Sequence, residues 1–198
     1  MNSQFKYLIG IDEAGRGPIA GPVAVGAVLM AVGDRESGIK LADLKIKTLD
    51  SKKLSAKKRE EIFKLIKDQK ENYSWAVSLV SEQVIDSEGI AFAIRLGVQK
   101  VLAKLKANPS ECLILLDGAL KAPVEFLNQK TIIRGDATET LIGLASICAK
   151  VTRDDFMLKA HADFPVYNFA QHKGYGTAFH YQALKTHGPC PLHRRSFL

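Results

Sequence analysis

Four acidic residues stand at or just after the ends of short apolar runs, where buried strands would end: Asp12, Glu13, Asp117 and Asp136. Carboxylates that gather without cations repel one another, which raises their pKa values and costs folding free energy. Mg²⁺ and Mn²⁺ prefer oxygen ligands of this kind. Two such ions can hydrolyse a phosphodiester, because one lowers the pKa of the attacking water and the other stabilises the leaving 3′ oxygen. We therefore predict that these four carboxylates hold two Mg²⁺ or Mn²⁺ ions and catalyse phosphodiester hydrolysis.

A glycine-rich segment, Gly15-Arg16-Gly17, follows the first acid pair directly. Glycine has no Cβ, so a ligand can approach the backbone N–H groups of this segment closely. The segment therefore predicts a phosphate site beside the metal site. Taken alone, the stretch 8–17 also fits a strand that leads into a tight turn with solvated acids. The later Asp residues that follow apolar runs favour the functional interpretation.

The basic residues of the chain point to nucleic acid. The formal net charge of +7 favours a polyanionic partner. Lys52 precedes a predicted helix, and Arg194 and Arg195 close a C-terminal region rich in basic and aromatic residues. We predict that these three residues contact phosphates, with a merely solvated lysine pair at 52–53 as the alternative. All five histidines lie after residue 160, and their spacing does not fit a zinc site. The alternative to a nucleic-acid-binding surface in this region is a loosely packed polar tail.

Strands and helices must bring these residues together, and the hydrophobic pattern predicts an α/β chain with a mixed sheet. The predicted strands cover residues 5–11, 23–31, 75–80, 112–116 and 131–133. The predicted helices run from Ser55 to about Lys70, from Ser81 to about Lys106 with a break near Gly89, and from Thr138 to about Ala160. Parallel strands bring their carboxyl ends to one edge, where open α/β sheets place their sites. Adjacent strand residues face opposite ways, so Asp12 and Glu13 both bind metal only if the strand kinks or ends there.

The sequence also predicts the caps, buried faces and charge contacts of these helices. Ser55 and Thr138 are the predicted N-caps of the first and last helix. The first helix is expected to bury four apolar residues, Ile62, Phe63, Leu65 and Ile66. Three charged residues at i, i+3, i+4 spacing in the last helix are expected to form a solvated ion network: Lys150, Arg153 and Asp154. Residues 33–48 are polar, contain two glycines and predict a loop.

The length and composition of the chain limit the number of domains and the cellular compartments that we expect. At 198 residues the chain fits a single domain, 1–198, in which about 160–198 forms a C-terminal segment that contacts substrate. The three cysteines are odd in number, far apart and in no metal-like spacing, which favours a reducing compartment. The longest apolar stretch, 19–32, is interrupted by Pro22 and two glycines and is too short to span a bilayer. We therefore expect a cytoplasmic monomer that makes no contact with a membrane.

The chain resembles the ribonuclease HII family, the type 2 ribonucleases H of bacteria. The motifs that carry the resemblance span nearly the whole length: Gly-Ile-Asp-Glu-Ala-Gly-Arg-Gly at 10–17 with Gly-Pro-Val at 21–23, Asp-Ser-Lys-Lys-Leu at 50–54, Leu-Asp-Gly at 116–118, Gly-Asp at 135–136, the segments 145–147 and 149–154, His-Lys-Gly-Tyr-Gly-Thr at 172–177, and the close at 188–189 and 193–197. One departure is Gly89, which stands where the family usually has Asn. We expect this change to affect a local turn.

The resemblance implies a ribonuclease H-like fold, with a five-stranded mixed sheet flanked by helices and a helical C-terminal extension. It implies that the four acids bind the metals, and that Gly15, Arg16, Gly17 and Tyr175 recognise the ribonucleotide 2′-OH at a 5′-RNA–DNA-3′ junction. The implied activity is that of a metal-dependent endoribonuclease that hydrolyses the RNA strand of RNA/DNA hybrids. It would also incise 5′ of single ribonucleotides embedded in duplex DNA, leaving 3′-hydroxyl and 5′-phosphate ends.

Two other functions compete with this interpretation. A catalytically silent hybrid-binding protein would keep the basic surface, but it would gain nothing from negative charge beside phosphate. Another metal nuclease of the same fold, such as a junction resolvase, would not need Tyr175 or the Gly-Arg-Gly segment. The full acid set and these recognition motifs therefore favour the endoribonuclease.

Overall fold

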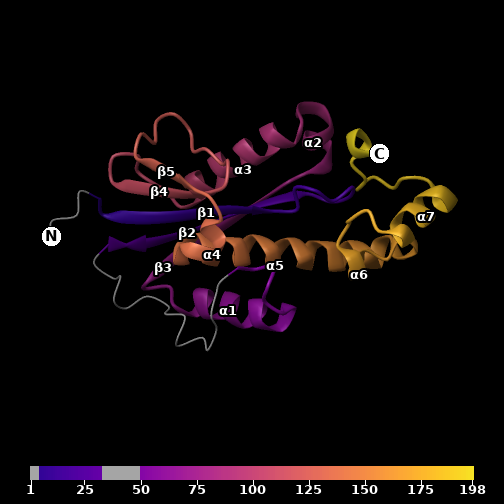
Figure 1. Ribbon diagram of the computed structural model, residues 1–198, viewed down its shortest axis with the longest axis horizontal. Coiled ribbons are helices and arrows are strands. Elements are labelled where there is room, and N and C mark those ends of the chain that lie inside the picture. Colours follow the sequence, from indigo (N-terminus) through magenta and orange to yellow (C-terminus); the bar gives the residue numbers. More distant parts are fainter. Residues whose placement is uncertain (1–4, 33–49) are drawn as a thin grey trace.

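A five-stranded mixed sheet forms the centre of the molecule (Figure 1). The structure, a computed structural model, describes residues 5–32 and 50–198, so the loop predicted at 33–48 lies outside the described residues. The strands are β1 Tyr7–Ala14, β2 Val23–Ala31, β3 Tyr73–Val80, β4 Cys112–Asp117 and β5 Gln129–Ile132, in the spatial order β3-β2-β1-β4-β5. β1 pairs antiparallel with β2 and parallel with β4, while β2–β3 is antiparallel and β4–β5 parallel. The predicted mixed α/β sheet is confirmed.

Helices cover both faces of this sheet. They are α1 Ala56–Asp68, α2 Glu82–Glu88, α3 Ile90–Lys104, α4 Gly135–Thr138, α5 Thr140–Asp163, α6 Phe169–His172 and α7 Ala178–His187. In Figure 1, α5 runs along one face with α1 beyond it, α2 and α3 lie on the other face, and α6 and α7 lie beyond the end of the sheet. None of the described helices is long and apolar enough to cross a membrane.

Glycines in the sheet let α5 approach it closely. A Cβ on Gly10 of β1 would stand 2.3 Å from the backbone of Leu141, and one on Gly26 of β2 would stand 2.3 Å from the carbonyl oxygen of Ala145. β1 alternates, so Gly10 and Asp12 face α5, whereas Ile9 and Ile11 belong to the core on the α3 side. This close packing places the first half of α5 directly beside Asp12.

Several boundaries and caps differ from the sequence predictions. β1 does not end at Ile11 but continues through both acids to Ala14, because its antiparallel pairing with β2 continues. Ser55 caps α1 as predicted, accepting a hydrogen bond from the backbone N–H of Lys58. Thr138 does not cap the long helix: it ends α4, and its hydroxyl donates to the carbonyl of Arg134.

Burial also corrects two predictions about helix faces. Leu65 is exposed, since it lies at the edge of the α1 stripe formed by Ile62, Phe63 and Ile66. Arg153 does not belong to a solvated network, because its side chain is 1 % exposed and donates to three backbone carbonyls. The spacing of charges along α5 did not reveal that the C-terminal region covers this part of the helix.

Gly89, the departure from the family pattern, joins α2 to α3. Its φ is 82°, and its N–H donates to the carbonyl of Ile85. Glycine adopts positive φ without steric cost, and asparagine is one of the few other residues that tolerate it. Gly89 therefore forms the turn between α2 and α3 without steric strain.

Candidate active site

The predicted acids meet where β1 and β4 run side by side. The parallel pairing of these strands ends at Ile11 opposite Leu116, and the next residue in each strand is an acid, Asp12 in β1 and Asp117 in β4. Asp136 lies in the first turn of α4, shortly after β5, and its backbone N–H donates to Asp117 Oδ1 at 3.4 Å. The parallel strand order thus brings acids from distant parts of the sequence to one edge of the sheet.

Burial and mutual repulsion perturb this cluster. Burial raises the pKa of Asp12 well above its usual range, and the charges of Glu13 and Asp117 raise it further, against a hydrogen bond from Ser146. Burial also raises the pKa of Glu13, against the nearby Arg16 guanidinium, whose Nη1 lies 3.6 Å from Glu13 Oε1. Carboxylates with raised pKa values in a partly buried cluster are common at functional sites.

The fourth acid brings the Asp-Ser-Lys segment into the site. Burial raises the pKa of Asp136, as do the charges of Asp117 and Asp50, whereas the ammonium group of Lys52 lowers it. Lys53 forms an ion pair with Asp50 at 3.2 Å. Lys52 therefore lies at the edge of the acid cluster, while Lys53 is engaged within its own segment.

A hydroxyl pair connects this segment to the most buried acid. Ser146 of α5 hydrogen-bonds the Asp12 carboxylate, and Ser51 Oγ lies 2.8 Å from Ser146 Oγ. Asp12 Oδ1 also accepts a hydrogen bond of 2.7 Å from the backbone N–H of Glu13. The sequence does not predict this contact, since nothing in the pattern of α5 separates Ser146 from the small residues around it.

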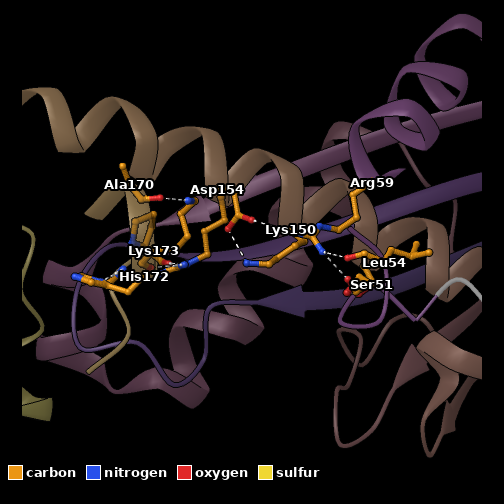
Figure 2. A network of polar contacts seen from close by, with 12 residues as sticks. Ser51, Leu54, Arg59, Lys150, Asp154, Ala170, His172 and Lys173 are labelled. Atoms are coloured by element: carbon orange, nitrogen blue, oxygen red, sulfur yellow. Dashed lines mark hydrogen bonds and ion pairs between the residues drawn. The ribbon is translucent and has the colours of Figure 1, made fainter. Parts of the chain in front are cut away.

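The network in Figure 2 fixes the same segment from the other side. Arg59 of α1 donates to the carbonyls of Ser51 and Leu54 and lies 3.7 Å from Asp154 of α5. Lys150 forms an ion pair of 2.7 Å with that same Asp154. Because α1 and α5 share these contacts, the Asp-Ser-Lys segment is held firmly against the acid cluster.

The donor chemistry of the cluster fits a divalent cation. Carboxylate oxygens suit Mg²⁺ and Mn²⁺, and a cation would offset the repulsion described above. Within residues 5–32 and 50–198, no three acidic, histidine or cysteine side chains already stand in an arrangement that could hold an ion. The acids would therefore have to turn toward one another to share one.

The Gly-Arg-Gly segment leaves β1 beside these acids in a tightly held turn. Gly15 has a φ of 89°, and a Cβ there would stand 2.0 Å from Arg153 Nε, so only glycine fits. In the part of the chain that the structure describes, the backbone N–H groups of Arg16 and Gly17 donate no hydrogen bond, and both residues are exposed. Two neighbouring amides therefore remain available to a ligand.

Arg194 requires a correction. The sequence predicts a phosphate contact, but the side chain is fully buried and its guanidinium donates to the carbonyls of Gly15, Arg16 and Gly21 at 2.7, 3.0 and 2.8 Å. Burial and the nearby Arg153 charge lower its pKa to about 9, which leaves it charged at neutral pH. The residue cannot reach a phosphate. In the sequence, Arg194 is one of two adjacent arginines, and this pattern does not show which of the two is buried.

Tyr175 projects from a turn that packs on the same loop. Its side chain is 46 % exposed, and the preceding Gly174 accepts hydrogen bonds from the N–H groups of Ile19 and Ala20. The Tyr175 carbonyl accepts a hydrogen bond of 2.8 Å from His180 Nδ1. The aromatic ring is thus solvent-accessible while its backbone is fixed.

The C-terminal histidines are not a loosely packed tail. His180 and His193 are buried, and their Nε2 atoms lie 2.9 Å apart. Tyr167 and Phe169 pack against both rings. The alternative of a polar tail is therefore wrong for this part of the region.

Exposed basic residues surround the site. Arg195 is exposed, and its backbone N–H is held by Asp86 of α2. Beside Arg16, a hollow of about 270 Å³ is lined by Arg95 of α3 and Lys121 as well as by apolar side chains. The sequence does not single out Arg95 or Lys121, because each is an isolated charge in an ordinary helix or loop.

Comparisons with known proteins agree with this architecture. The family model described as "Ribonuclease HII" matches residues 9–198. The "Ribonuclease HII" of Endomicrobium trichonymphae is 45 % identical over 196 residues, which cover 99 % of this chain and 87 % of that protein. The crystal structure of the ribonuclease H2 from Pyrococcus horikoshii OT3 has a TM-score of 0.70 at 25 % identity, covering 96 % of this chain and 93 % of that one. The crystal structure of Bst-RNase HIII in complex with Mn²⁺ has a TM-score of 0.67 at 17 % identity, and the match covers 94 % of this chain and 64 % of that one. The chain therefore has the ribonuclease H-like fold and belongs to the ribonuclease HII family of endoribonucleases.

Proposed function

We propose that this protein hydrolyses the RNA strand of RNA/DNA hybrids and incises duplex DNA on the 5′ side of single ribonucleotides, leaving 3′-hydroxyl and 5′-phosphate ends. The observation that carries the proposal is the position of two open amides, those of Arg16 and Gly17, directly after the acid pair of β1. A group that can recognise ribose therefore lies next to a group that can support hydrolysis.

The acids supply the hydrolytic part of the site. Asp12, Glu13, Asp117 and Asp136 are the proposed ligands of two Mg²⁺ or Mn²⁺ ions, which when bound lower the pKa of water and stabilise the leaving 3′ oxygen. Ser146 keeps the Asp12 carboxylate oriented through its hydrogen bond. The Mn²⁺ held by the HIII enzyme of the same fold supports this choice of cation.

Recognition belongs to the neighbouring loop and turn. The amides of the Gly15-Arg16-Gly17 segment donate to the ribose, and the Tyr175 hydroxyl donates a further hydrogen bond while its ring stacks on the adjacent sugar. Proteins distinguish RNA from DNA at one position through the 2′-OH. A site built to hydrogen-bond a hydroxyl can reject the analogue that lacks it by about 10⁴–10⁵-fold.

The exposed basic residues bind the backbone of the duplex. Lys52 at the edge of the acid cluster and Arg195 after the C-terminal turn are the proposed phosphate contacts. We expect the protein to act as a cytoplasmic monomer on hybrids and on ribonucleotide-containing DNA. A silent binder is disfavoured, because four acids beside phosphate would weaken binding without catalysis.

A cleavage assay tests this proposal. With Mg²⁺, a duplex that carries one ribonucleotide should be cut once, 5′ of that residue, and an all-DNA duplex of the same sequence should stay intact. Cleavage of both duplexes would instead indicate a nuclease without ribose recognition. Cleavage of neither, together with binding of hybrid, would indicate the silent binder.

Replacing Tyr175 tests its separate role. We expect Tyr175→Ala to lose far more activity on a single embedded ribonucleotide than on a long RNA strand, where flanking 2′-OH contacts compensate. Tyr175→Phe separates the contribution of the hydroxyl from that of the ring. Equal losses on both substrates would assign Tyr175 a general role in folding or binding.

A further inference from the structure

Two buried arginines hold the loop that follows β1, and they differ in which peptide groups they contact. Arg194 donates to the carbonyls of Gly15 and Arg16, as well as to that of Gly21. Arg153 donates to the carbonyls of Ala20, Pro22 and Lys173. Both side chains are almost completely buried, so neither can contact a substrate directly.

The carbonyls that Arg194 contacts belong to the two peptides with open amides. A planar peptide group contains the carbonyl of one residue and the N–H of the next. The Gly15 carbonyl therefore shares its peptide with the N–H of Arg16, and the Arg16 carbonyl shares its peptide with the N–H of Gly17. These are the N–H groups that donate no hydrogen bond among the described residues.

The peptides contacted by Arg153 are different, because their N–H groups are used inside the protein. The N–H that shares a peptide with the Ala20 carbonyl, that of Gly21, donates to the carbonyl of Leu192. The N–H that follows the Lys173 carbonyl, that of Gly174, donates to His172 Nδ1. The two arginines are thus equally buried, and each donates to three backbone carbonyls. They differ in whether the N–H groups of the contacted peptides are free to bind a ligand.

We propose that Arg194 is a positioning residue that determines ribose specificity by orienting and polarising the Arg16 and Gly17 amides from behind. This inference rests on the proposed function, in which those amides donate to the ribose. A charged donor on a carbonyl makes a short, strong hydrogen bond, and chains of hydrogen bonds polarise one another. The rigid fork of the guanidinium reaches both carbonyls at once, which fixes the direction of the two N–H groups relative to each other.

The surroundings of Arg194 keep that fork in place. Its own N–H donates to the carbonyl of Ile19, and the ring of Phe197 lies 5.2 Å from its guanidinium carbon. The next two residues of the chain, Arg195 and Ser196, are anchored by their N–H groups to the carboxylate of Asp86. The C-terminal segment therefore presents a preorganised guanidinium to the recognition loop.

The test compares Arg194→Lys with Arg153→Lys as the matched control. Lysine keeps the charge but cannot bridge the two carbonyls, so we expect Arg194→Lys to lower kcat/KM on a single-ribonucleotide duplex about 10- to 100-fold relative to a long hybrid. Arg153→Lys should lose comparable thermal stability and leave the ratio between the two substrates unchanged. Equal ratios in the two variants would overturn the proposal.

Amide proton chemical shifts provide a readout that does not depend on activity. In Arg194→Lys the amide protons of Arg16 and Gly17 should move upfield, because their peptides lose a charged partner. In Arg153→Lys they should keep their positions within the smaller changes of the surrounding loop. Unchanged shifts in Arg194→Lys would contradict the proposed polarisation.

A second variant covers the case in which Arg194→Lys fails to fold. Phe197→Leu removes the ring beside the guanidinium while leaving its three hydrogen bonds, and it should lower the substrate ratio about 2- to 5-fold. No change in that ratio would overturn the proposal. If Tyr175→Ala shows no substrate preference, the proposed ribose recognition fails as a whole; if Tyr175→Ala shows the preference and Arg194→Lys does not, only the role of Arg194 fails.

Discussion

Asp117 is the acid that the other three share. Its charge raises the pKa values of Asp12, Glu13 and Asp136, and its Oδ1 accepts the Asp136 N–H. It is the last residue of β4, between β1 and β5 in the sheet. Removing its charge therefore affects the whole cluster at once.

We predict that Asp117→Asn lowers cleavage at least about 100-fold, because the loss of one ligand charge costs several kcal/mol of transition-state stabilisation. In metal-free buffer the variant should fold with equal or slightly higher stability, since repulsion within the cluster is relieved. Single-turnover cleavage and thermal unfolding measure the two effects. Normal turnover in the variant would remove Asp117 from the proposed site.

At the scale of single residues, the sequence correctly placed Asp12 and Asp117 at the ends of neighbouring strands, whereas the phosphate contact predicted for Arg194 was wrong. An acid after an apolar run is costly in most contexts, so the pattern itself indicated a site. Arg194 and Arg195 are adjacent and chemically identical, yet one is buried against carbonyls and the other is exposed. Which of them is buried depends on the path of the C-terminal segment, and no local pattern encodes that path.

Among the elements, α7 and the C-terminal segment support Tyr175 through a directed pair of histidines. His193 Nδ1 accepts the Cys190 N–H, so its Nε2 carries the proton and donates to His180 Nε2. His180 Nδ1 then donates to the Tyr175 carbonyl. Both rings are neutral in this chain of hydrogen bonds. Protonating His180 would place two donors face to face.

This arrangement predicts acid sensitivity. Burial, followed by the nearby His172 and His193, lowers the pKa of His180 to about 4 from its ordinary value of 6.5. At this residue the unfolded chain therefore binds more protons than the folded protein between these two values, so the contribution of His180 to stability should fall by about 1–3 kcal/mol as the pH drops from 6.5 to 4. The buried acids act in the opposite direction, because the raised pKa of Asp12 makes the folded state bind the extra proton. Thermal unfolding of the unmutated protein and of His180→Gln across this range measures the His180 contribution as a difference. His187→Gln, which changes an exposed histidine of the same helix, should keep the profile of the unmutated protein, and the same profile for His180→Gln would contradict the neutral pair.

The sheet, the long helices and the Ser55 cap were predictable, whereas the start of α5 and the contacts between distant parts of the sequence were not. β2 has the predicted bounds, and α2 and α3 meet at Gly89 as expected, because their apolar periodicity is strong. Thr138 was the predicted N-cap of the long helix, but it is the last residue of the short helix α4, and α5 begins at Thr140. The tie between Ser51 and Ser146 joins positions 95 residues apart, which periodicity cannot show.

For the whole molecule, the net charge of +7 predicts that affinity for hybrid falls steeply with salt as counterions are released. Replacing Lys52 and Arg195 together by Ala should flatten the slope of log affinity against log salt by about 2. Lys64 and Lys70, two exposed lysines of α1 and the turn after it, provide a control pair of equal charge. An equal change of slope in both double variants would show that overall charge, rather than these two contacts, sets the salt dependence.

The central claim is that four carboxylates from distant parts of the chain form one divalent-cation site, and thermal unfolding with and without Mg²⁺ or Mn²⁺ tests it most directly. At an ion concentration ten times the dissociation constant, binding to the folded state alone adds about 1.4 kcal/mol, or about 3–6 °C in Tm for a chain of this size. We predict this rise for the unmutated protein and a much smaller one for Asp117→Asn. A Tm that does not respond to either metal, or that rises equally in both proteins, would contradict the account.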